Sequence, residues 1–165
     1  MKNRVFVAFV TVVFLIGALL GYLLSCNPLI RPYKLLFVIG SIYNLMAVVV
    51  LSELFVTTKR HKEISVNYVA PAVLWTHTQI ALGATIGALA GKFIFKAPGG
   101  EMAVGFSSAV FAYSIIPLGL FDSIVVFPRT KKFTDLETRW KYFGLFMVTS
   151  GVLLQLVASI IDVRY

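Results

Sequence analysis

The sequence predicts an all-α membrane protein, a polytopic bundle of transmembrane helices that crosses the bilayer about five times with its N-terminus inside. Three observations predict this class. The 165-residue chain is 59% hydrophobic with a mean hydropathy of +0.89, only 13% of its residues are charged, and the charges form short runs between long apolar stretches. Because a soluble domain usually carries about a quarter charged residues, we expect lipid to cover much of this surface.

Five apolar stretches have the length of a membrane span, since about 20 apolar residues cross the roughly 30 Å hydrocarbon layer. We expect these spans at residues 5–25, 35–56, 69–91, 102–127 and 142–161. The connections between them are short. The chain therefore reads as a single transmembrane domain over residues 1–165.

The first span has an alternative interpretation. Lys2 and Arg4 precede an apolar run that ends at Cys26, and this order resembles a lipoprotein signal peptide. The apolar run of about 20 residues is longer than the 7–15 residues usual in a signal peptide. Its length favours a retained membrane span.

The distribution of basic residues predicts the orientation, because loops on the inner side of a membrane carry an excess of lysine and arginine. With five spans, ten of the 15 basic residues fall on the side of the N-terminus and five on the other. The smaller group consists of Arg31, Lys34, Lys92, Lys96 and Arg164. We therefore expect the N-terminus inside and the C-terminus outside.

Glycines recur every four residues in two of the spans, and such spacing aligns them on one helix face. The third span carries the longer series and the first span a shorter one; the residues are Gly83, Gly87 and Gly91, and Gly17 and Gly21. A flat face lets a neighbouring backbone approach closely, which drives helix association in lipid. The face is expected to pack within the bundle, or alternatively against another subunit or a flat lipid such as a sterol or quinone.

Ionisable and amide side chains within the spans are candidates for function, because polar groups are costly at membrane depth. The alternating spans place Glu53, His77 and Asp122 in the same, inner half of the membrane, with Gln79 near His77. Such a cluster is suited to carry a proton, bind a cation or hold a polar head group. Structural pairing with nearby basic residues is the alternative.

Two amides lie deeper in the predicted spans. Asn44 is near the middle of the second span and Gln155 is within the fifth. Each is expected to form a hydrogen bond across helices, with a contribution of around 1 kcal/mol.

Several classes of function are disfavoured. The net charge of +8 is spread over loops that flank spans, so no domain remains to bind nucleic acid. The single cysteine excludes an intrachain disulfide and a thiolate zinc cluster. The H-E-x-x-H, C-x-x-C and P-loop motifs are absent from the sequence. We therefore predict no metal or cofactor bound by this chain alone, and no enzymatic activity.

The sequence favours a non-catalytic integral membrane subunit of a larger membrane protein complex, in contact with membrane lipids and with other membrane subunits. Two alternatives stay open. One is a small oligomeric transporter or channel that uses Glu53, His77 and Asp122. The other is a lipid- or sterol-binding accessory protein.

Overall fold

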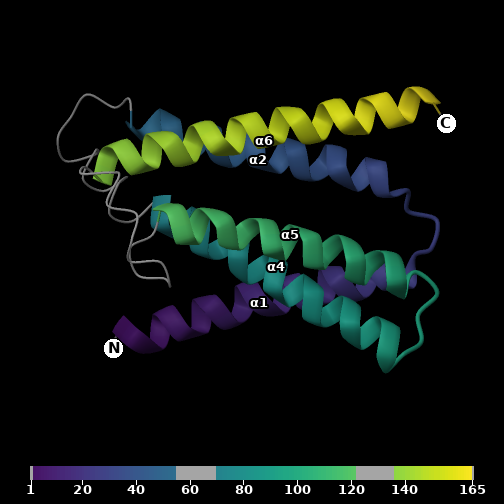
Figure 1. Cartoon of the computed structure of the whole chain (residues 1–165). Coiled ribbons are helices and arrows are strands. Elements are labelled where there is room, and N and C mark those ends of the chain that lie inside the picture. The colour runs from purple at the N-terminus through teal and green to yellow at the C-terminus, as the bar shows by residue number, and fades with distance from the viewer. Residues whose placement is uncertain (1, 55–69, 122–135, 165) are drawn as a thin grey trace. The chain divides into compact units, whose positions relative to one another are not determined.

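The structure, a computed structural model, describes residues 2–54, 70–121 and 136–164 (Figure 1). All regular elements in these ranges are helices, which confirms the predicted all-α class. They are α1 (Lys2–Cys26), α2 (Pro32–Leu54), α4 (Ala70–Phe93), α5 (Gly100–Phe121) and α6 (Leu136–Arg164).

Within the described ranges, three helices are long and apolar enough to cross a membrane, which supports a membrane protein. The qualifying segments are Val7–Cys26, Pro32–Leu51 and Lys141–Val163. A shorter apolar segment, Gly100–Ile116, lies in α5. In α4, small residues and the polar side chains of residues 76–79 replace large aliphatic ones, which lowers its hydropathy although it is 24 residues long.

The chain divides into two compact units. The first consists of Met1–Ile30 and Leu74–Ile116, and the second of Arg31–Val73 and Pro117–Tyr165. The first unit therefore holds α1 and most of α4 and α5, whereas the second holds α2 and α6.

In the first unit, α1 and α4 run in the same direction and touch backbone to backbone. A Cβ added at Gly17 would overlap the carbonyl oxygen of Ile80, and one added at Gly21 would overlap that of Ala84. The residue numbers in contact increase together along α1 and α4, so the two helices are parallel. Such close approach is the usual way in which helices gain contact energy in lipid.

The end of α1 is joined to the connection between α4 and α5. The Gly99 amide donates to the Ser25 carbonyl at 2.8 Å, and the Ser25 hydroxyl donates to the Gly21 carbonyl at 3.0 Å. At Lys96 the chain adopts a φ of 49°, a left-handed conformation that turns it away from α4. The Ala97 amide then donates to the Gly91 carbonyl at 2.9 Å, which satisfies one of the last carbonyls of the helix.

In the second unit, α2 and α6 lie side by side and antiparallel (Figure 1). Gly40 faces Gly151, and about two to three helix turns away Leu51 faces Gly144. The fully buried apolar side chains of this unit come from both helices: Tyr43, Ala47, Val50, Phe143 and Met147.

Candidate functional site

A chain of three polar side chains joins α2 to α6, and we call Ser41, Asn44 and Gln155 the polar seam. The Asn44 Nδ2 atom donates to Gln155 Oε1 at 3.2 Å, and Gln155 Nε2 donates to Ser41 Oγ at 2.9 Å. The Ser41 hydroxyl in turn donates to the Phe37 carbonyl of its own helix at 3.0 Å. Asn44 and Gln155, each expected to bond across helices, thus bond to one another.

Two glycines let the polar side chains of the two helices meet. A Cβ on Gly40 would lie 2.6 Å from the Gly151 carbonyl oxygen, and a Cβ on Gly151 would overlap Asn44 Oδ1. Only a residue without a side chain fits at either position. The helices therefore approach closely where the amides need to reach each other.

The polar seam lies deep within the two candidate spans. Ser41 is nine residues beyond Pro32, and Gln155 is eight residues before Val163. At 1.5 Å per residue, both lie about 12 to 14 Å from the nearer end of their span. This is close to the middle of a hydrocarbon layer about 30 Å thick.

The polar seam is not fully covered. Ser41 is exposed, and Asn44 and Gln155 are half-buried. The Oδ1 atom of Asn44 is buried against Gly151 and accepts no hydrogen bond from the described residues. An apolar helix pair thus presents hydrogen-bonding groups at a depth where lipid offers no polar partner.

The glycines of the first and third predicted spans lie together between α1 and α4. A Cβ at Gly83 would overlap the Phe14 carbonyl oxygen, and one at Gly87 would overlap that of Ala18. A Cβ at Gly91 would lie 2.6 Å from the Cβ of Ser25. The glycine face of each helix is therefore occupied by the other helix of the pair.

The predicted cluster of Glu53, His77 and Asp122 falls only partly within the described residues. His77 is buried in α4, with 8% of its surface exposed, and Gln79 is half-buried two residues further on. Glu53 belongs to the last turn of α2, but its side chain is outside the described part, as is the whole of Asp122. The cluster remains a prediction.

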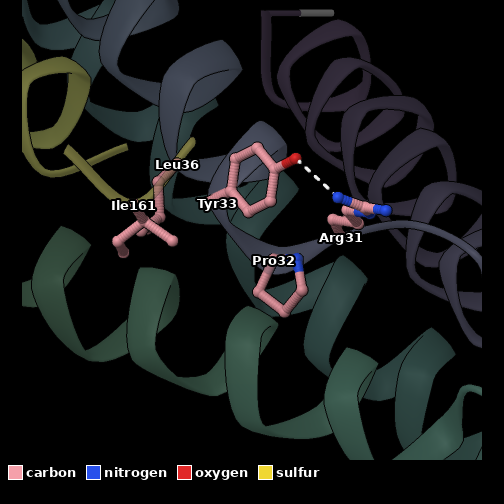
Figure 2. A pocket seen from close by; sticks show the side chains of 5 residues that line it. All are labelled: Arg31, Pro32, Tyr33, Leu36 and Ile161. Carbon is pink, nitrogen blue, oxygen red and sulfur yellow. Dashed lines mark hydrogen bonds between the residues drawn. The ribbon is translucent and has the colours of Figure 1, made fainter. Parts of the chain in front are cut away.

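A shallow pocket of about 440 Å³ opens where α2 begins and α6 ends, and it is lined by Arg31, Pro32, Tyr33, Leu36 and Ile161 (Figure 2). The Arg31 guanidinium donates to the Tyr33 hydroxyl at 3.2 Å. Figure 2 shows the Tyr33 ring between this guanidinium and the apolar side chains of Leu36 and Ile161. The pocket therefore has one cationic end and one apolar end.

Sequence reasoning missed three of these features: the glycines of the α2–α6 contact, the part played by Ser41, and the pocket at Arg31. A signal for the first was available. Gly40 precedes Asn44 by four residues, and Gly151 precedes Gln155 by four, so each pair shares one helix face. No comparable pattern marks the pocket, because its residues come from two segments far apart in the sequence.

Within the described ranges, no three histidine, cysteine, aspartate or glutamate side chains gather closely enough to hold a metal ion. Comparison of the chain with protein-family models, with curated proteins and with solved structures finds no match.

Proposed function

We propose that the chain is a multi-pass, non-catalytic subunit of a larger integral membrane complex, with five spans and its N-terminus inside. The polar seam carries the proposal. Hydrogen-bonding groups exposed to lipid near the bilayer centre are unfavourable, and Ser, Asn and Gln side chains at this depth usually bond to a neighbouring helix. A helix of another subunit with a polar side chain of its own would cover Ser41 and Gln155.

The helix directions support five crossings. In a chain with five consecutive spans, the first and third point the same way, whereas the second and fifth point in opposite ways. The parallel pair α1 and α4 and the antiparallel pair α2 and α6 both agree with this order. Because α4 follows the candidate span in α1 from Phe14 to Ser25 by direct contact, the two helices share one depth range.

The proposal is tested by native mass spectrometry of the protein extracted gently from its own membrane. We expect other chains at a fixed ratio. The variant Ser41→Leu removes the exposed hydroxyl and adds bulk at the seam, so the partner should be lost. Thr11→Leu is the matched control, since Thr11 is also exposed and also bonds its own helix, to the Val7 carbonyl at 2.9 Å.

Two outcomes would overturn the proposal. A homo-oligomer without other chains would favour the transporter or channel alternative, and flux measurements on His77→Ala and Asp122→Asn would come next. Equal loss of the partner in Ser41→Leu and Thr11→Leu would show that the seam has no special part in assembly. Circular dichroism of both variants shows whether the helices still form.

A further inference from the structure

We propose that the pocket at Arg31 binds an anionic phospholipid, with its phosphate on Arg31 and Tyr33 and an acyl chain along Leu36 and Ile161. The site belongs to the α2–α6 unit alone. It is separate from the polar seam, which lies deeper on the same helix pair. The inference therefore does not depend on the proposed role as a subunit.

The polar end of the pocket has unused capacity to bind an anion. Arg31 is exposed, and its guanidinium carries five N–H donors, one of which is directed at the Tyr33 hydroxyl. Tyr33 is neutral, so its bond leaves the charge of Arg31 uncompensated. The Tyr33 hydroxyl accepts from Arg31 and keeps its own hydrogen to donate to a phosphate oxygen.

The other charged groups nearby do not cancel this charge. Lys34 and Asp162 are exposed at the same end of the helix pair, and neither lines the pocket. In the described part of the chain, Arg31 forms no ion pair, so its guanidinium brings an uncompensated positive charge to the lining of the pocket.

The order of polar and apolar groups matches the order of a lipid in a membrane. Arg31 immediately precedes the candidate span Pro32–Leu51, so its guanidinium is at the level of the head groups. Leu36 is five residues further along α2, about 7 Å deeper. Ile161 comes from the end of α6 and completes the apolar wall.

The size of the pocket fits part of a lipid. Its volume of about 440 Å³ falls within the roughly 300–1,000 Å³ of small-molecule sites. A zwitterionic lipid brings a cationic group along with its phosphate, so an anionic lipid is the better match for a pocket with a net positive charge.

The test is lipid retention by the full chain. The protein is delipidated in detergent, incubated with phosphatidylglycerol or with phosphatidylcholine, and examined by native mass spectrometry. We expect preferential retention of phosphatidylglycerol. Arg31→Gln should weaken this retention about tenfold, because it removes a direct charge-assisted hydrogen bond to the phosphate. Leu36→Trp, which fills the apolar end, should also weaken it.

Lys34→Gln is the matched control. It removes an exposed positive charge from the same helix turn without changing the pocket, and it should leave retention within about twofold. An equal loss of lipid retention in Arg31→Gln and Lys34→Gln would mean that only the general positive charge of the surface matters. The proposed site would then be wrong. Inorganic phosphate at millimolar concentration distinguishes a lipid site from a free-anion site. If it displaces the lipid completely, or if Leu36→Trp has no effect, the acyl chain has no part in binding and the proposal is wrong.

Discussion

The side-chain amide of Asn44 on α2 donates to Gln155 Oε1 on α6 at 3.2 Å, across 111 positions of sequence. This bond is a directional polar contact between α2 and α6, which apolar side chains cannot form. In lipid, the unfolded helices are already surrounded by apolar groups, so hydrophobic burial does little to select a partner. The bond between Asn44 and Gln155 and the glycine contact beside it therefore specify this helix pair.

A double-mutant cycle measures that link. Asn44→Ala and Gln155→Ala should each destabilise the protein, and the double variant should lose less than the sum of the two. We expect a coupling free energy of about 1 kcal/mol, near the upper part of the range for hydrogen bonds between membrane helices. Unfolding by SDS in mixed micelles provides the free energies. A coupling of zero would mean that the amides bond equally well to other partners.

The glycine contact between α1 and α4 gives the second prediction. Gly87→Ala places a Cβ on the Ala18 carbonyl oxygen, and backbone atoms cannot move aside as a flexible side chain can. We expect a loss of about 1 to 3 kcal/mol in the free energy of unfolding, as for other overpacked contacts. SDS unfolding checks this value.

Gly105→Ala is the matched control for Gly87→Ala. Gly105 is exposed on α5, and a Cβ there meets nothing within 4 Å. Its replacement should leave stability unchanged or raise it slightly, because alanine has the higher helix propensity. Similar losses for the two variants would contradict the contact between α1 and α4 as the cause.

At the beginning of α5, two neighbouring variants compare the contribution of a surface ion pair with that of a close backbone contact. Lys92 and Glu101 form an ion pair at 3.6 Å, but the Glu101 side chain is 89% exposed. Glu101→Gln should therefore change stability by less than about 0.5 kcal/mol. Gly100→Ala should cost more, since its Cβ would lie 2.8 Å from the Cα of Lys92. A larger loss of stability for Glu101→Gln than for Gly100→Ala would show that the ion pair contributes more than the backbone contact, contrary to this prediction.

The orientation is open to test through the single cysteine. Cys26 is exposed at the end of α1, on the side opposite the N-terminus if α1 spans the membrane. With the N-terminus inside, a membrane-impermeant maleimide should label Cys26 in intact cells or right-side-out vesicles. A Lys59→Cys variant in a Cys26→Ser background should react only after permeabilisation. The opposite pattern would place the N-terminus outside.

The helices and their approximate ends were predictable from local sequence. Apolar length and the flanking charges are properties of one segment, and the expected spans at residues 5–25 and 142–161 correspond to α1 and α6. The expected depth of Asn44 in α2 and of Gln155 in α6 follows from their positions in these apolar helices and stays a prediction. Even so, length and composition identify only three of the described helices as candidate spans. The apolar segment of α5 is shorter, and α4 has small residues where other spans have large ones.

The candidate sites were less predictable. The glycine repeat on α4 marked a flat face, but its spacing did not say that α1 would fill it. Gly40 and Gly151 each occur with a polar residue four positions later, a pattern that becomes meaningful only when both helices are seen together. Of the predicted cluster of Glu53, His77 and Asp122, the side chains of Glu53 and Asp122 lie outside the described residues, and the cluster stays a prediction.

The sequence by itself determined that this protein is helical and belongs in a membrane, because each span must satisfy its own backbone hydrogen bonds and match the bilayer with apolar side chains. The tertiary structure decided which helices are partners: α1 with α4, and α2 with α6. Lipid solvates every apolar face equally well, so hydropathy does not distinguish one partner from another. Partner choice depends on the fit of glycine against backbone and on the bond from Asn44 to Gln155, and both exist only once two helices meet.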